Sequence, residues 1–306
     1  MTESHNPIES GNEDSGFRVS PVRGCLTGAV IFVVFYACLI GLSKLLRFFI
    51  QSDVLDRPGF SIADFAFSLI FSYAVWRLLK IKNPIKIIGL NWDPLALPHI
   101  LIGTVFGLGG VALTFIIISV AAEVRIVEGF YGGSGSTLTI GSLYPLVAAF
   151  MFFVYAGSEE VFSRGLLFPV IKGSVGLSGG IFFSSLAFSI MHFFNPSFSI
   201  LPAIDILLAG ILLCLCKELT GNLWLAWGTH FGWNFGLILA GIPVSGYLVI
   251  VRQLNFHIET HGPDWITGGA FGPEGGVGAI LADSAMILAV LILISIKNRK
   301  VARTAP

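Results

Sequence analysis

The chain has 306 residues, of which 55% are hydrophobic and 12% are charged, and its formal net charge is zero. Soluble domains carry about 25% charged residues, so this composition excludes an ordinary water-soluble fold. A neutral chain with a sequence pI near 7.0 also lacks the basic surface that nucleic-acid binding needs. The sequence therefore predicts a membrane protein that crosses the bilayer several times and binds no nucleic acid.

Eight apolar segments approach the length of about 20 residues that a helix needs to cross a bilayer. In chain order they are 26–46, 61–80, 98–121, 140–163, 178–195, 200–216, 222–242 and 277–296. We therefore expect an all-α polytopic membrane protein with about eight transmembrane helices. The first segment is long and has no clear small-residue cleavage site, so it is predicted to be an anchor and not a removed signal peptide.

Lysine and arginine indicate the orientation. With the N-terminus in the cytoplasm, 13 of these residues fall on the inner side of the membrane and 5 on the outer side. Because inner loops are enriched in positive charge, both termini are predicted to be cytoplasmic. The bias fits a prokaryotic plasma membrane, which we expect, and would also suit an endoplasmic reticulum membrane.

The same pattern divides the chain into five regions. They are a flexible cytoplasmic tail (1–24), the first three helices with a Gly-rich outer loop (25–139), a core of four helices (140–242), an outer loop (243–276), and the last helix with a basic cytoplasmic tail (277–306).

The fourth apolar segment carries two adjacent glutamates and an arginine, Glu159, Glu160 and Arg164. An ionisable residue inside a span is costly and is therefore a candidate for function. Glu160 and Arg164 are four residues apart on one helix face, so we expect them to pair. Glu159 lies about 100° further round the helix, so it is predicted to face elsewhere and to be free for chemistry.

Other ionisable residues have a simpler interpretation. Asp64, Asp205 and Asp283 fall within about two turns of predicted outer helix ends. Lys217 and Glu218 lie in a predicted short inner turn. Because water is near at these depths, we expect all of them to be structural and solvated.

Two later segments supply imidazoles. His192 lies in the fifth segment, and His230 and Asn234 lie at i and i+4 on one face of the seventh. A carboxylate and two imidazoles on three helices can hold a water, either by hydrogen bonds or as metal ligands. Glu with two His is a known catalytic zinc set, and Asn234 can donate a hydrogen bond to an oxyanion. The chemistry indicated is amide hydrolysis inside the bilayer.

Three motifs carry a family resemblance: Glu159-Glu160-x-x-x-Arg164, Phe188-x-x-x-His192 and His230-x-x-x-Asn234. In order and spacing they resemble the motifs of the CAAX prenyl endopeptidase and bacteriocin-processing family, the CPBP or Abi-type intramembrane proteases. The resemblance covers about residues 140–242, which would be the protease core. It implies an α-helical endopeptidase of the CAAX prenyl protease type 2 kind, with a catalytic cavity open to the cytoplasmic side.

The resemblance also implies a role for each residue. Glu159 and His192 would activate the water, while His230 and Asn234 would bind the oxyanion. The ion pair of the first motif would brace the site. In a zinc-dependent version Glu159, His192 and His230 would be metal ligands, and a metal-free glutamate-type protease is the other version. The partners expected are the lipid bilayer and a peptide or membrane-protein substrate.

Two other readings of the motifs stay open, namely a proteolytically inactive scaffold or immunity-type protein and a transporter with an ion relay. A transporter is disfavoured because the chain has no internal repeat.

Two further patterns are interpreted as coincidental. Gly132-Gly133-Ser134-Gly135 matches a rhomboid serine protease pattern but lies in a predicted outer loop. His257-Ile258-Glu259-Thr260-His261 has its glutamate misplaced relative to H-E-x-x-H, and we expect a solvated loop there.

Overall fold

The computed structural model describes residues 20–49, 56–128, 144–248 and 256–304. Long helices make up most of this part of the chain. They are α1 (Pro21–Phe49), α2 (Asp56–Leu78), α4 (Ala96–Ala121), α5 (Tyr144–Phe162), α6 (Phe168–Met191), α7 (Ile200–Thr220), α8 (Trp224–Leu239) and α10 (Val277–Thr304). The shorter elements are α3 (Pro84–Ile88), α9 (Asp264–Thr267), the π-helical turn η3 (Ser163–Leu167), and the 3-10 turns η5 (Gly269–Phe271) and η6 (Pro273–Gly275).

Helices that are apolar and long enough to cross a membrane confirm a multi-pass helical membrane protein. Six of them occur in the described residues. One of the six is a continuous run over 146–191 that joins α5, η3 and α6. This run covers two of the expected spans and breaks at Gly176, whose φ of 78° is outside the helical range. Helix α8 has 16 residues and is shorter than the segment expected over 222–242.

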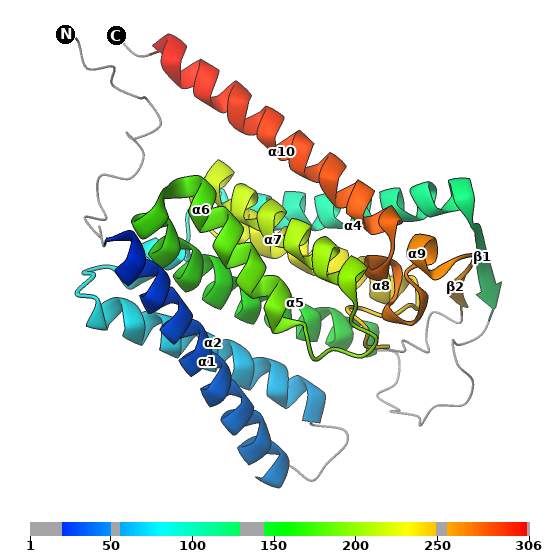
Figure 1. The fold of residues 1–306 in the computed structure, drawn as a ribbon, viewed down its shortest axis with the longest axis horizontal. Helices are drawn as coiled ribbons and strands as arrows, with labels where there is room; N and C mark the ends of the chain where they lie inside the picture. The colour runs from blue at the N-terminus through cyan, green and yellow to red at the C-terminus, as the bar shows by residue number, and fades with distance from the viewer. Residues whose placement is uncertain (1–19, 50–55, 129–143, 249–255, 305–306) are drawn as a thin grey trace.

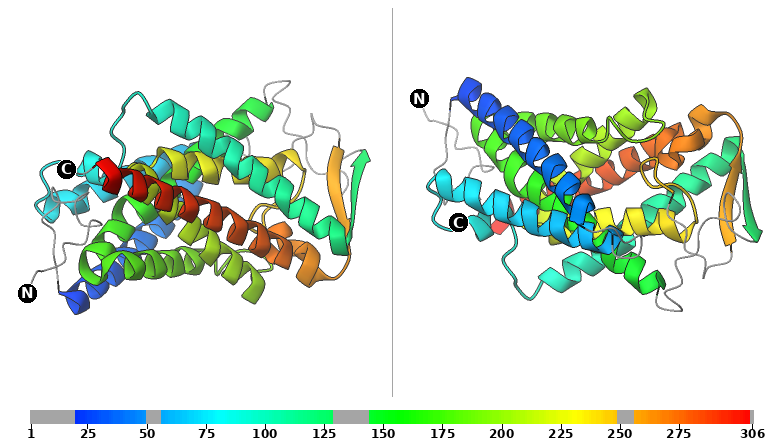
Figure 2. Two further views of the ribbon diagram at one scale, coloured as in Figure 1. Left: turned by 90° about the horizontal axis from the view of Figure 1, so that it is seen from above. Right: turned by 90° about the horizontal axis from the view of Figure 1, so that it is seen from below.

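The helices form one bundle with distinct ends. Helices α1 and α2 cover one side of it, and α10 runs across another (Figure 1). The views from above and below show a two-stranded ribbon at the end away from the start of α1 (Figure 2). The side chain of Phe35 on α1 stacks on Phe162 of α5 with ring centroids 3.6 Å apart, which joins the outer helices to the core.

The ribbon corrects the all-helical expectation. Strand β1 (Glu123–Glu128) pairs in antiparallel register with β2 (Phe256–His261), so that Glu123 lies opposite His261. We expected both segments to be loop. The pairing connects residues more than a hundred positions apart, and their local patterns are too short to predict it.

Helices α4 and α8 touch through glycine. Each helix carries a Gly-Thr-x-Phe-Gly sequence, at 103–107 and at 228–232. A Cβ on Gly107 would overlap the Thr229 carbonyl oxygen, and a Cβ on Gly232 would overlap the Thr104 carbonyl oxygen. Small residues of this kind allow close backbone approach in membranes. Residues 230 and 234 are about 200° from the glycines on the α8 wheel, so this packing turns them toward the bundle interior.

The substitution Gly107→Val tests this packing. We expect it to lower the free energy of unfolding by about 1–3 kcal/mol, because the new side chain must push α8 away. The matched control is Gly109→Val in the same helix, where a Cβ meets nothing within 4 Å. Thermal unfolding in detergent measures both variants. Equal midpoints for the two would contradict a backbone contact between α4 and α8.

Candidate active site

A π-helical turn connects α5 to α6 next to the paired glutamates. Turns of this type are frequent at functional sites. Lys217 of α7 donates from Nζ to the Arg164 carbonyl oxygen at 2.6 Å, and Trp76 of α2 donates from Nε1 to the Gly165 carbonyl oxygen at 3.1 Å. Lys217 also donates to the carbonyl of Ile87 at 3.1 Å. Side chains from two other helices therefore bind the carbonyl groups of this turn.

Lys217 differs from the sequence interpretation. It was expected in a solvated turn, but it is only 7% exposed because the backbone carbonyls around it replace water. Its neighbour Glu218 does stay partly exposed and pairs with Lys172 at 2.7 Å. Hydropathy cannot distinguish these two positions, since the carbonyl acceptors of Lys217 lie on distant segments.

The expected pair of Glu160 and Arg164 is present. Arg164 Nη1 lies 2.9 Å from Glu160 Oε1, and the two side chains are 1% and 0% exposed. Arg164 also donates to the Gly210 carbonyl at 3.3 Å, and its guanidinium carbon lies 4.1 Å from the centre of the Phe188 ring. His230 Nδ1 donates to the same Glu160 oxygen at 2.9 Å. Glu160 therefore joins the arginine to the imidazole.

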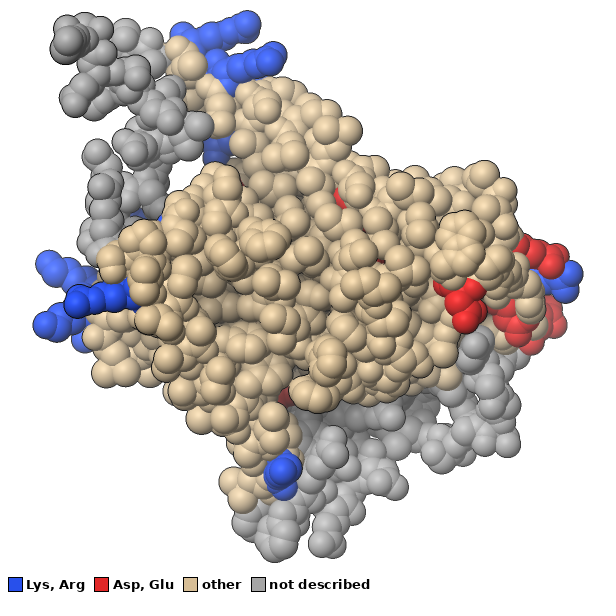
Figure 3. Space-filling view, in the orientation of Figure 1, with Lys and Arg blue, Asp and Glu red and all other residues tan. Residues whose placement is uncertain are grey.

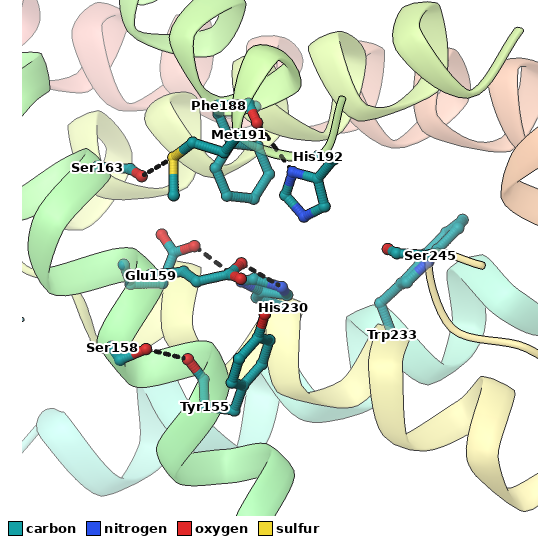
Figure 4. A network of polar contacts seen from close by, with 12 residues as sticks. Tyr155, Ser158, Glu159, Ser163, Phe188, Met191, His192, His230, Trp233 and Ser245 are labelled. Atoms are coloured by element: carbon teal, nitrogen blue, oxygen red, sulfur yellow. Dashed lines mark hydrogen bonds and ion pairs between the residues drawn. The ribbon is translucent and has the colours of Figure 1, made fainter. Parts of the chain in front are cut away.

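Glu159 lies beside this chain of contacts (Figure 4). Its Oε2 is 3.7 Å from His230 Nε2 and is buried without a hydrogen-bond partner in the described residues. The Tyr155 ring points toward Glu159 and His230, and the Tyr155 hydroxyl is within hydrogen-bonding reach of the Glu159 carboxylate. Glu159 thus has one free buried oxygen close to an imidazole whose other nitrogen is already bonded.

His192 follows the last residue of α6. Its Nδ1 donates to the Phe188 carbonyl at 2.9 Å, and its ring lies 4.9 Å from the Phe188 ring. Phe188 also meets the His230 ring edge-on, with centroids 6.0 Å apart. The helix ends at Met191, four residues before the end of the expected span over 178–195. The apolar residues after it are exposed, so their hydropathy made the predicted helix too long.

Two cavities divide the predicted residues. Glu159 lines one of about 80 Å³ with Tyr36, Asp64 and Tyr155. A second cavity of about 40 Å³ is lined by residues that include His192, His230 and Asn234. Room for one water takes about 10–15 Å³, so both can hold water. His230 lies between Glu159 and the second cavity, and His192 and Glu159 line different cavities.

A shared metal ion would need its ligands close to one point. In the ranges that the structure covers, no three side chains among His, Cys, Asp and Glu gather in that way. Glu159 and His230 lie together, but His192 lines the other cavity. This arrangement does not fit the predicted ligand set.

Sequence reasoning missed the acidic character of the second cavity. Asp205 and Asp283, expected near water, are 2% and 1% exposed and line it. Glu274 lines it too, and burial raises the pKa of this carboxyl group. The sequence could have marked the two aspartates as buried, because each stands in an apolar segment. Glu274 lies in a Gly- and Pro-rich loop, where nothing in the sequence indicates burial.

The coincidental patterns have separate outcomes. Gly132-Gly133-Ser134-Gly135 lies outside the described residues. The segment 257–261 is strand β2 and not a loop, and Glu259 accepts hydrogen bonds from His257 at 3.0 Å and His261 at 3.1 Å. The bond from His257 lowers the pKa of Glu259 most. This cluster lies on the ribbon, apart from both cavities.

The buried pair gives a stability prediction. Arg164→Met leaves Glu160 buried without its cation, so we expect the free energy of unfolding to fall by about 3–5 kcal/mol. Adding Glu160→Gln removes the orphaned charge and should restore part of the loss. Lys172→Met is the control, because its partly exposed pair should contribute at most about 1 kcal/mol. Thermal unfolding in detergent that ranks Arg164→Met with Lys172→Met would contradict the prediction.

Comparison with known proteins matches the segment that carries the three motifs to a known family. The family model of the Rce1-like proteins, described as type II CAAX prenyl endopeptidase Rce1-like, matches residues 141–236. No curated protein and no solved structure matches the chain. The match covers about a third of the chain and includes all three motifs, from Glu159 to Asn234. The segment that carries the candidate site is thus similar to the Rce1-like type II CAAX prenyl endopeptidases, and this match supports the resemblance drawn from the three motifs.

Proposed function

We propose that the chain is an intramembrane endopeptidase in which Glu159 activates the attacking water. The matched family is a peptidase family. The observation that carries the proposal is the free Oε2 of Glu159, buried 3.7 Å from His230 Nε2. That separation is too long for a good direct hydrogen bond and suits a water between the two atoms.

The hydrogen bond at His230 Nδ1 determines which tautomer the ring adopts and therefore whether Nε2 can accept a hydrogen bond. Because Nδ1–H is donated to Glu160, the neutral ring presents a lone pair at Nε2. A water between Nε2 and Glu159 then donates both hydrogens and keeps its oxygen lone pairs for a peptide carbonyl carbon. Glu159 takes a proton as the carbon–oxygen bond forms and returns it to the leaving amine.

This assignment exchanges the expected roles of the two histidines. The family resemblance implied His192 as the partner of Glu159, whereas His230 is the imidazole beside it here. We assign His192 and Asn234, which line the adjoining cavity, to the substrate carbonyl and its developing oxyanion. Glu160 and Arg164 hold His230 and keep the local charge balanced.

We also propose eight crossings with both termini in the cytoplasm. The break at Gly176 divides the 146–191 run into two legs, and α8 supplies another crossing. Lys and Arg gather at the left of the view, where α10 finishes and below it, with smaller blue patches at the bottom and at the ribbon end, and Asp and Glu gather mostly at the ribbon end (Figure 3). That separation supports the positive-inside orientation, most simply in a prokaryotic plasma membrane.

The substitution Glu159→Gln tests catalysis. It keeps the shape of the side chain but cannot accept a proton, so we expect cleavage to fall by about 100- to 10,000-fold. The measurement compares membrane-associated peptides from cells that express each form at matched abundance. The control is Glu128→Gln, an exposed glutamate on β1.

The outcome separates the candidate functions. Precursors that accumulate only with Glu159→Gln support a protease and identify its substrates. Identical peptide profiles, with the variant folded and any host phenotype retained, would favour an inactive scaffold or immunity-type protein. Altered solute flux without a change in peptides would favour a transporter.

A chelator tests the metal-free chemistry. Because His192 and Glu159 line different cavities, we expect cleavage by the purified protein to survive excess EDTA. The assay follows cleavage of a substrate found in the comparison above, with and without EDTA. Activity that EDTA removes and added zinc restores would contradict this prediction and support a zinc-bound version.

A further inference from the structure

The cavity that contains His192, His230 and Asn234 extends to an acidic wall. Asp205 comes from α7, Glu274 from η6 and Asp283 from α10, and all three line the cavity. Their exposed fractions are 2%, 5% and 1%. Separate elements therefore turn buried carboxyl groups toward one small space.

No lysine or arginine of the described part of the chain lines this cavity. Glu274 accepts hydrogen bonds from Trp233 Nε1 at 3.0 Å and from the Ser245 backbone. Asp205 Oδ1 and Asp283 Oδ2 accept none from the residues that the structure describes. The basic groups that face the cavity are His192 of α6 and His230 of α8, and His230 is already bonded to Glu160.

A buried carboxyl group is costly unless it meets a cation or keeps its proton. Burial of an unpaired charge carries a large desolvation penalty, and inside a membrane protein such residues mark function. The two aspartates keep free acceptor atoms at this cost. The cavity therefore offers more hydrogen-bond acceptors than its own residues use.

The rest of the wall suits a hydrocarbon stem. Phe188, Ile206, Ala209, Leu212 and Trp233 are apolar lining residues. A cavity of about 40 Å³ accepts groups of the size of a few waters, which suits an ammonium group better than the larger guanidinium fork. A single metal ion suits it less, because no three His, Cys, Asp or Glu side chains among the described residues converge on one point.

We propose that this cavity is a substrate subsite that binds the primary ammonium group of a lysine side chain near the scissile bond. The Asp205 and Asp283 oxygens accept its hydrogen bonds, and the apolar residues contact its methylene groups. The assignment to a substrate lysine rests on the proposed peptidase function. Binding of an ammonium group in the cavity does not depend on the peptidase function.

The first test is therefore independent of catalysis. The full-length protein in detergent is titrated with n-butylammonium chloride, and thermal unfolding is followed beside equal concentrations of n-butanol and sodium chloride. Ligands that bind the folded state raise the midpoint, so we expect a rise with n-butylammonium alone. The rise should be lost in Asp205→Asn and in Asp283→Asn, and retained in Asp264→Asn, an exposed aspartate of α9.

Three results would overturn the ammonium site. They are no rise in the wild type, an equal rise in both cavity variants, or an equal rise with sodium chloride, which would indicate a general ionic effect. The wild-type comparison of n-butylammonium with n-butanol keeps the proposal falsifiable if a variant fails to fold.

The second test concerns the substrate. N-acetylated peptides carry, at each position near the cleavage site in turn, either lysine or norleucine, which lacks only the ammonium group. We expect one position where lysine raises kcat/KM by at least about tenfold, as one charge-assisted hydrogen bond supplies. Asp205→Asn and Asp283→Asn should reduce that ratio, and Asp264→Asn should not.

The two tests separate the subsite from the proposed function. Cleavage that ignores lysine at every position overturns the subsite and leaves the peptidase proposal standing. Binding of n-butylammonium without cleavage of any peptide supports the ammonium site and contradicts the peptidase proposal.

Discussion

A fully buried guanidinium constrains the assembly of this bundle. Because a guanidinium stays charged even when it is buried, the groups around Arg164 must offset its desolvation penalty. Glu160 supplies the counter-charge from α5, Gly210 supplies a carbonyl from α7, and Phe188 supplies a ring face from α6. Three helices are thereby fixed around one cation. The remaining contact of Glu160, to His230, adds α8 to the set.

The chemistry of the candidate site follows from this arrangement. Arg164 neutralises Glu160, so Glu160 serves as an oriented hydrogen-bond acceptor. Its neighbour Glu159, one position along the same helix, pairs with no lysine or arginine among the described residues and keeps a free oxygen beside His230. Adjacent residues of one type thus acquire different roles, because a helix turns them toward different neighbours.

The sequence predicted what depends on local spacing. The i and i+4 positions of Glu160 and Arg164 predicted their pair, and apolar runs located the long helices. Local spacing could not predict contacts between distant segments. Asp205 and Asp283 were placed near water because hydropathy reports only depth along a helix. The carbonyl partners of Lys217 lie 53 to 130 positions away, and the two paired strands lie more than a hundred positions apart.

The π-helical turn at Ser163–Leu167 limits the insertions and deletions that this chain can accept during evolution. A regular helix advances by about 100° per residue, so the number of residues in this turn determines the rotational phase of α6 relative to α5. Deletion of one residue there would rotate Val170 and Ile171, which pack in one core cluster with Phe162, relative to α5 even if every side chain were kept. Substitutions along the turn alter single contacts, whereas a change in its length alters all of them together. The length of this five-residue turn is therefore under stricter constraint than most of its side chains.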